Sequence, residues 1–315
     1  MILSSAQLSE QHQQHLEKKY PGQVFIFCDS MNEAEEHLPD AEILITYGAD
    51  LTEELLSKAS KLKWIMIISA GIEKLPFNAL EQRDIIVTSA RGVHKAPSSE
   101  YVFFMLMLVC RQGKQLISNE ADKIWTRNIH MEEITGKSIL IAGTGAIGQE
   151  VARIAKAFQM RTYGVSRSGK TVEYFDKTLT HDEMDKYMPE VDFVISILPS
   201  TDETRGFFNY AHFQRMPRHA VFMNIGRGDA VKEEEILKAV HNQEIAHAVL
   251  DVFEVEPLPE NHPFWEEEKI TVTSHLSGVS PNYHTRALGI FEENLERYLS
   301  DHQDYINKID TSKRY

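Results

Sequence analysis

The sequence predicts an α/β protein with two domains, each built around a parallel β-sheet that helices cover on both faces. Three observations support this fold class. Short apolar runs alternate with helix-like stretches in both halves of the chain, which is the pattern of parallel sheets with crossover helices. The length of 315 residues is about twice that of a typical domain. A glycine-rich loop directly follows an apolar run near the middle of the chain.

The first half of the chain contains the elements of one such sheet. Thr52 is suited to cap a helix whose inward face would include Leu55 and Leu56. The expected buried strands are 24–27, 43–46, 64–68 and 85–88, and the expected helices between them are 32–38 and 52–59.

A long helix is predicted to follow and to connect the two domains. Pro97 suits its first turn, and Ser98 and Glu100 suit its positive end. The next ten residues, 101–110, are almost wholly apolar. A helix that is apolar on all sides must be buried between domains or against another subunit.

The second alternating series begins near Gly136. Its expected strands are 138–142, 161–165, 191–198, 220–225, 246–252 and 270–273. Its expected helices are 146–158 and 232–240, and one more helix, from Pro281 to about Leu299, should return to the first domain.

The composition disfavours several classes of partner. The net charge of −14 argues against nucleic acid and anionic membranes, because a polyanion requires a basic surface. The apolar run 101–110 is about half the length that spans a bilayer, and the N-terminus lacks the regions of a signal peptide. Cys28 and Cys110 lie in apolar runs without metal-ligand spacing. We therefore expect buried thiols, no metal site and a cytoplasmic protein.

The glycine-rich loop predicts a dinucleotide site. It follows the strand 138–142 and opens an amphipathic helix, which is the context that phosphate binding requires. The helix N-terminus would offer N–H groups and partial positive charge to a pyrophosphate. The residues of the loop are Gly143, Thr144, Gly145, Ala146, Ile147 and Gly148.

The end of the next strand indicates which dinucleotide binds. NAD sites place a carboxylate there to bind the ribose hydroxyls, but this strand ends in Ser166, Arg167 and Ser168, and the nearest acid, Glu173, comes later. The guanidinium of Arg167 suits a phosphate, and Lys170 could add positive charge. The sequence therefore favours NADP(H), with NAD(H) as the other possibility.

Three further segments place polar residues directly after apolar strands, where ligands of open α/β sheets bind. Hydride transfer to a ketone needs a proton donor, for which a histidine beside a glutamate is suited. An anionic substrate needs a cation, for which an arginine is suited. The segments are 224–228, 251–257 and 273–278, and they contain one arginine and one histidine together with several acids.

With these motifs in their order and spacing, the chain resembles the D-isomer-specific 2-hydroxyacid dehydrogenase family over nearly its whole length. The resemblance implies that Arg227 binds the substrate's carboxylate and carbonyl, that His275 is the acid/base and that Glu256 pairs with His275. It also implies that Asp251 contacts the nicotinamide amide. Two positions depart from the family pattern: Ser274 stands where proline is common, and Ser166 replaces the ribose-binding aspartate.

The resemblance assigns further contacts. Arg227, Asp251 and His275 would also lie along the cofactor. The segment Ser69, Ala70 and Gly71 resembles the family's loop that holds the substrate carboxylate. Further cofactor contacts are implied for Leu198, Pro199, Ser200, Thr204, Ile225 and Gly226.

The resemblance also implies two Rossmann-like domains with the active site in the cleft between them. The flavodoxin-like substrate domain would comprise 1–98 and 280–315, and the dinucleotide-binding domain 99–279. In the family the helix near 101–117 often packs in a dimer interface, so we expect a homodimer.

The combination of Ser166 and Ser274 makes the chain most similar to the NADPH-preferring glyoxylate and hydroxypyruvate reductases. The expected reaction is NADPH-dependent reduction of a small 2-oxo acid to a (2R)-hydroxy acid. Two alternatives stay open. One is an NAD-linked D-2-hydroxyacid or phosphoglycerate dehydrogenase. The other is a non-catalytic, nucleotide-sensing regulatory protein of the same fold.

Overall fold

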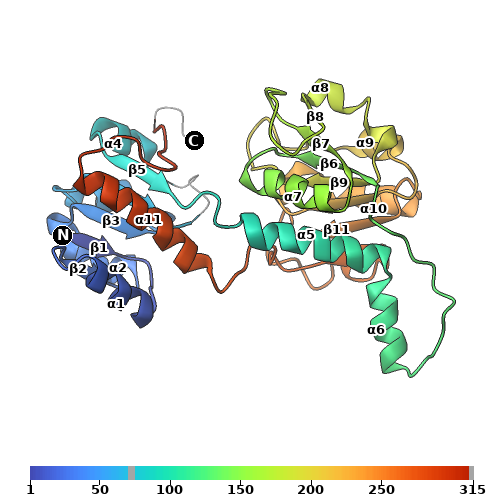
Figure 1. Ribbon diagram of the computed structural model, residues 1–315, viewed down its shortest axis with the longest axis horizontal. Helices are drawn as coiled ribbons and strands as arrows, with labels where there is room; N and C mark the ends of the chain where they lie inside the picture. Colours follow the sequence, from blue (N-terminus) through green and yellow to red (C-terminus); the bar gives the residue numbers. More distant parts are fainter. Residues whose placement is uncertain (70–74, 312–315) are drawn as a thin grey trace. The chain divides into compact units, whose positions relative to one another are not determined.

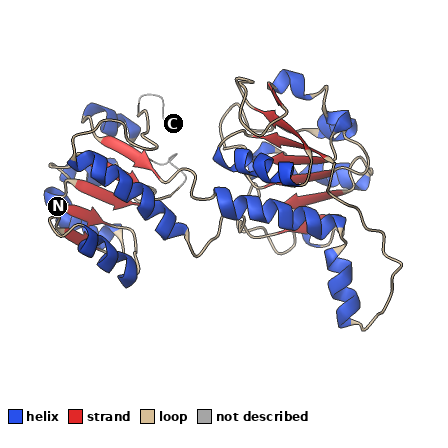
Figure 2. Cartoon of the chain, in the orientation of Figure 1, coloured by secondary structure: helices blue, strands red, loops and turns tan. Residues whose placement is uncertain are grey.

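The computed structural model describes residues 1–69 and 75–311. They form two compact units, one of Met1–His94 with Ser280–Tyr315 and one of Lys95–Val279. Each unit is a parallel sheet between helices (Figures 1 and 2). The predicted fold class is confirmed.

The first unit contains a five-stranded sheet in the order β2-β1-β3-β4-β5, and every neighbouring pair is parallel. This is the flavodoxin-like strand order. Its strands are β1 (Ile2–Ser4), β2 (Phe25–Phe27), β3 (Ile43–Thr46), β4 (Trp64–Ile67) and β5 (Ile86–Ser89).

The last helix of the chain, α11 (Tyr283–Leu299), packs on this first sheet. The ring of Phe291 stacks on that of Trp64, with centroids 5.3 Å apart, and both side chains are buried. The other helices of the unit are α1 (Glu10–Lys19), α2 (Met31–Ala34), α3 (Glu53–Lys58) and α4 (Phe77–Gln82).

The second unit contains a seven-stranded parallel sheet in the order β12-β11-β10-β9-β6-β7-β8. The order reverses between β6 and β9, which is the switch point where ligands bind in such sheets. Its strands are β6 (Ser138–Ala142), β7 (Arg161–Val165), β8 (Lys177–Leu179), β9 (Phe193–Ser196), β10 (Val221–Asn224), β11 (His247–Leu250) and β12 (Ile270–Val272).

The long apolar helix α5 (Lys95–Cys110) is buried on one side only within its unit. Phe103 stacks on Phe158 beside α7, with ring centroids 5.4 Å apart, whereas Phe104 is 58% exposed. The helix α6 and the segment after it project from the body of the unit (Figure 1). The remaining helices are α6 (Gly113–Ala121), α7 (Ala146–Ala157), α8 (His181–Met184), α9 (Tyr210–Arg215) and α10 (Glu233–His241).

Several local expectations need correction. The predicted helix 32–38 is a short α-helix followed by a 3-10 helix, Glu35–Asp40, which contains Pro39. Proline lacks the N–H that a continuing α-helix would use. The interior strand β1, between β2 and β3, was not predicted, because three residues at the chain end carry too little pattern. By contrast, Thr52 caps α3 as expected, and its side chain accepts a hydrogen bond from Leu55 N.

Two features are absent from the part of the chain that the structure describes. None of the helices in residues 1–69 and 75–311 is both long and apolar enough to cross a membrane. Within the same residues, no three His, Cys, Asp or Glu side chains come together in a way that could hold a metal ion.

Candidate active site

The predicted polar segments of the second unit follow strands of one parallel sheet, so they lie along a single sheet edge. The glycine loop follows β6, and the loops after β9, β10, β11 and β12 contain the other predicted residues. The strand order places β6 and β9 side by side at the switch point. Segments more than a hundred residues apart in sequence are thereby brought to one edge.

The glycine loop is shaped for close backbone packing. A Cβ on Gly148 would lie only 1.9 Å from the carbonyl oxygen of Gly143, so only glycine fits there. Gly145 is the N-cap of α7, and a Cβ built on it would meet nothing within 4 Å. The backbone at Gly145 therefore faces open space.

This loop fits a dinucleotide pyrophosphate. In the described chain no side chain caps the N-terminus of α7, so the first N–H groups of this 12-residue helix remain available to an anion. Thr144, Ala146 and Ile147 complete the loop between β6 and the first turn of α7.

The tip of β7 carries the residues predicted to select the cofactor. The hydroxyl of Ser166 accepts a hydrogen bond from Gly169 N at 3.2 Å, which folds the tip into a turn, and Ser168 accepts from Lys170 N. The guanidinium Nη1 of Arg167 lies 3.4 Å from Oε2 of Glu203. Sequence reasoning missed Glu203, because it lies 36 residues further along the chain, in a different loop.

The loop after β9 is tied to the segment that carries Arg227. Ser200 donates a hydrogen bond to Asp229 Oδ2 at 2.5 Å, and Thr204 donates to the carbonyl of Pro199 at 2.5 Å. The segment's Gly226 approaches so closely that a Cβ there would lie 2.5 Å from the carbonyl oxygen of Leu198. The predicted cofactor residues of the two loops therefore pack against each other.

Arg227 stands in a backbone turn after β10. Asn224 holds this turn, because its side-chain amide donates to the carbonyl of Arg227 at 2.9 Å and accepts from Gly226 N at 3.1 Å. The side chain of Arg227 donates to the carbonyl of Gly226, while Ile225 is buried. No carboxylate pairs with this guanidinium among residues 1–69 and 75–311. It is available to an anionic ligand.

Asp251 organises the turn that carries His275. Its side chain is fully buried, and Oδ1 accepts hydrogen bonds from Leu276 N at 2.8 Å and from the Thr273 hydroxyl at 2.6 Å. Oδ2 accepts from Ser277 N at 2.9 Å. This structural role was not foreseen, and the expected contact with nicotinamide stays a prediction.

His275 and Glu256 lie together as an acid/base pair requires. Nδ1 of His275 is 2.8 Å from Oε2 of Glu256, whose other oxygen accepts from Phe253 N at 3.1 Å. His275 has a φ of 57°, in the left-handed region that a non-glycine residue rarely adopts. Its N–H donates to the carbonyl of Asp251 at 2.8 Å, which helps hold this conformation. In the described part of the chain nothing bonds Nε2, so this nitrogen remains to exchange a proton.

A cavity of about 440 Å³ lies beside this pair. Its polar lining includes Glu256 and His275 together with Thr273 and Ser274, and its apolar walls include Leu258, Trp265 and Val272. Of the predicted substrate loop, Ser69 belongs to the first unit, where its hydroxyl donates to the carbonyl of Tyr47 at 2.7 Å. Ala70 and Gly71 lie outside the described residues.

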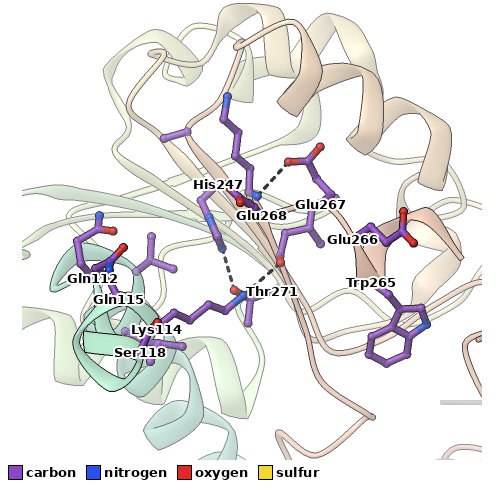
Figure 3. A pocket seen from close by; sticks show the side chains of 15 residues that line it. Gln112, Lys114, Gln115, Ser118, His247, Trp265, Glu266, Glu267, Glu268 and Thr271 are labelled. Atoms are coloured by element: carbon purple, nitrogen blue, oxygen red, sulfur yellow. Dashed lines mark hydrogen bonds between the residues drawn. The ribbon is translucent and has the colours of Figure 1, made fainter. Parts of the chain in front are cut away.

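A second cavity, of about 610 Å³, contains none of the predicted site residues. It lies at the amino-terminal ends of β11 and β12, against α6 (Figure 3). His247 bonds the Thr271 hydroxyl there at 2.8 Å, and burial lowers the pKa of His247 to about 4. Because ligands of such sheets bind at the opposite edge, the catalytic site is not expected here.

Comparison with known proteins identifies the family of the chain. Residues 103–277 match the family model described as D-isomer specific 2-hydroxyacid dehydrogenase, NAD binding domain. A glyoxylate reductase of Korarchaeum cryptofilum is 29% identical over 82% of this chain and 80% of its own length.

Two solved structures cover nearly the whole chain. A D-isomer specific 2-hydroxyacid dehydrogenase family protein from Aeromonas salmonicida has a TM-score of 0.86 and 32% identity, covering 98% of each chain. An NADPH-dependent glyoxylate/hydroxypyruvate reductase from Sinorhizobium meliloti, solved with NADP and sulfate, has a TM-score of 0.80 and 26% identity. It covers 100% of this chain and 99% of its own.

Proposed function

The chain belongs to the D-isomer-specific 2-hydroxyacid dehydrogenase family, and on that premise we propose that it reduces a small 2-oxo acid, such as glyoxylate or hydroxypyruvate, with NADPH. Membership makes it an oxidoreductase that acts on CH–OH groups with NAD(P). The observation that carries the proposal is the His275–Glu256 pair, which stands at the same sheet edge as the glycine loop and the unpaired Arg227.

The residues at this edge divide the chemistry between them. Arg227 holds the carboxylate of the 2-oxo acid by charge-assisted hydrogen bonds. His275 delivers a proton from Nε2 to the forming alkoxide, while Glu256 fixes the ring through Nδ1 and stabilises its charged form. When bound, NADPH supplies the hydride. The product is the corresponding 2-hydroxy acid, with the (2R) configuration wherever C2 becomes a stereocentre.

A panel of substrates tests the reaction. Glyoxylate, hydroxypyruvate and pyruvate are each incubated with NADPH or NADH, and cofactor oxidation is followed by absorbance. D-3-phosphoglycerate is tested with NAD⁺ and NADP⁺ in the opposite direction. We expect turnover with at least one 2-oxo acid and a higher kcat/KM for NADPH. Oxidation of phosphoglycerate without 2-oxo acid reduction would refute the proposed substrate class.

The preference for NADPH rests on Arg167 and on the absence of an acid at the tip of β7. Replacing Arg167 by aspartate should lower kcat/KM for NADPH roughly 30-fold or more, because charge-assisted hydrogen bonds to a 2′-phosphate contribute about 2 kcal/mol. NADH, which lacks that phosphate, should be affected much less. The measurement is kcat/KM for NADPH divided by kcat/KM for NADH, at a saturating concentration of the 2-oxo acid.

Lys170→Ala is the comparison for this substitution. It removes a nearby positive charge, but an ammonium group cannot bind a phosphate through two parallel hydrogen bonds as a guanidinium can. Its effect on kcat/KM for NADPH should therefore be several-fold smaller. A native enzyme that prefers NADH, or an Arg167→Asp variant with an unchanged ratio, would contradict the proposed cofactor.

We also propose that the protein is a homodimer. Exposed apolar side chains occur on α5, on α6 and on the segment after it. Exposed apolar patches of this kind mark interaction surfaces. The residues are Phe104, Met107, Leu116, Ile117, Ile124 and Trp125, and Trp125 is 96% exposed.

A charge placed on this surface should dissociate the dimer. Ile117 is 65% exposed on α6, and Ile117→Glu would bury a carboxylate in the proposed interface, weakening association by at least about tenfold. Val24→Glu is the matched control, because Val24 is equally exposed but lies in the other unit. Sedimentation velocity should show dimers for the native protein and Val24→Glu, and monomers for Ile117→Glu at low concentration. A monomeric native protein would disprove the proposal.

A further inference from the structure

The proposed cofactor site contains a carboxylate whose place near Arg167 the sequence did not indicate. Glu203 Oε2 lies 3.4 Å from Arg167 Nη1, and the two side chains are 69% and 74% exposed. Arg167 stands at the tip of β7, and Glu203 lies in the loop that follows β9. The residue expected to bind a 2′-phosphate is therefore paired with an acid from another loop.

This pairing connects two segments whose backbones are held in place. At the tip of β7, Ser166 N donates to the carbonyl of Leu179 at 3.0 Å. In the other loop, the Thr204 hydroxyl accepts from Thr201 N at 2.9 Å and donates to the carbonyl of Pro199 at 2.5 Å. These hydrogen bonds close the loop on itself around Glu203, which restricts its backbone opposite Arg167.

The pair has a different consequence for each form of the cofactor. A 2′-phosphate that binds Arg167 competes with Glu203 for the Nη1 side of the guanidinium and brings at least one further negative charge close to the carboxylate. Like charges a few ångström apart repel even in water, enough to change an equilibrium several-fold. A cofactor without the phosphate meets neither obstacle. We propose that Glu203 is a specificity-determining residue that moderates the preference for NADP(H) and keeps the site accessible to NAD(H).

This inference rests on the proposed function in one respect, namely that Arg167 faces the 2′-phosphate. The pair is exposed and contributes little to stability. Glu203→Gln removes the charge and keeps the size of the side chain, and its melting temperature should match that of the native protein. Any change in cofactor affinity can then be attributed to the lost charge and not to a change in stability.

The test measures affinity for NADP⁺ and NAD⁺ by titration calorimetry, together with the kcat/KM ratio for NADPH over NADH. Glu203→Gln should bind NADP⁺ about three- to tenfold more tightly, with little change for NAD⁺. The gain should shrink as salt is raised, because salt screens exposed charges. An unchanged ratio of the two affinities would overturn the proposal.

Asp202→Asn is the matched control. Asp202 is the neighbouring residue, is fully exposed and pairs with Arg205 instead, at 3.1 Å. Its substitution removes the same charge from the same loop and should change the ratio less than half as much as Glu203→Gln. An equal change would show a general effect of net charge and would refute the specific role of Glu203.

A double variant separates this inference from the proposed function. In an Arg167→Ala background the competition no longer exists and only the repulsion between the carboxylate and the phosphate remains, so the effect of Glu203→Gln on NADP⁺ affinity should be smaller. An effect of undiminished size would refute competition for Arg167. If Arg167→Ala alone leaves NADP⁺ affinity unchanged, the assignment of Arg167 under the proposed function fails, and the role given to Glu203 fails with it. If Arg167→Ala weakens NADP⁺ but Glu203→Gln changes nothing, only the inference about Glu203 fails.

Discussion

Replacing His275 by alanine is expected to lower kcat at least about 100-fold, because a positioned proton donor contributes roughly that factor or more. Binding of NADP⁺ should persist, since the glycine loop and Arg167 are unchanged. Steady-state kinetics with the best 2-oxo acid gives kcat, and titration of the cofactor gives its affinity. Glu256→Gln should lower kcat less, because an amide can still orient the ring through Nδ1 but cannot stabilise its positive charge.

The chain offers a second histidine–glutamate pair as a control. His241 Nε2 lies 2.9 Å from Glu267 Oε2, nearly the same separation as in the His275 pair. His241 ends α10, away from the loops after the strands, so His241→Ala should retain kcat within about twofold of the native enzyme. Normal turnover by His275→Ala, or an equal loss of kcat in both variants, would refute the assignment of His275 as the proton donor.

Replacing Asp251 by alanine should lower the free energy of unfolding of the second unit by about 3–5 kcal/mol. The carboxylate accepts three hydrogen bonds in a fully buried site, and its loss leaves the backbone N–H groups of Leu276 and Ser277 without this acceptor. The same hydrogen bonds hold the turn that carries His275, so kcat should fall as well. Urea denaturation followed by circular dichroism measures the first effect.

An exposed aspartate gives the comparison for this large effect. The side chain of Asp202 is fully exposed, and Asp202→Ala should change the unfolding free energy by less than about 0.5 kcal/mol. The loss of unfolding free energy for Asp251→Asn should lie between those of the two alanine variants. The amide oxygen still accepts a hydrogen bond, whereas the amide NH₂ group is a donor that faces another donor. A loss below about 1 kcal/mol for Asp251→Ala would mean that the buried hydrogen bonds do not hold the turn.

Elements with a strong local pattern were predicted well. The strand 138–142, the helix that begins at Ala146 and the strand 161–165 match β6, the start of α7 and β7. Each depends on neighbouring residues: a buried strand needs a continuous apolar run, and the turn into α7 needs glycine at positions where a side chain would collide. The family resemblance rests on the same kind of local motif, and it is confirmed.

Where local pattern was weak, prediction failed. β1 has only three residues, yet it lies inside the first sheet, between β2 and β3. Its place depends on pairing with strands more than twenty residues away, which no local pattern records. The same holds for α5, whose apolar sequence does not reveal that Phe104 and Met107 face outward from their unit.

The sequence by itself determined the chemistry of the site: a glycine loop before a helix, an arginine in place of an acid, and a histidine and a glutamate after successive strands. Only the tertiary structure decided which of these groups meet. Strand order brought Glu203 to Arg167 and turned the carboxylate of Asp251 onto the turn that carries His275. Such contacts join loops 25 or more residues apart, so they depend on how the whole sheet is assembled, whereas residue type and spacing are properties of the chain alone.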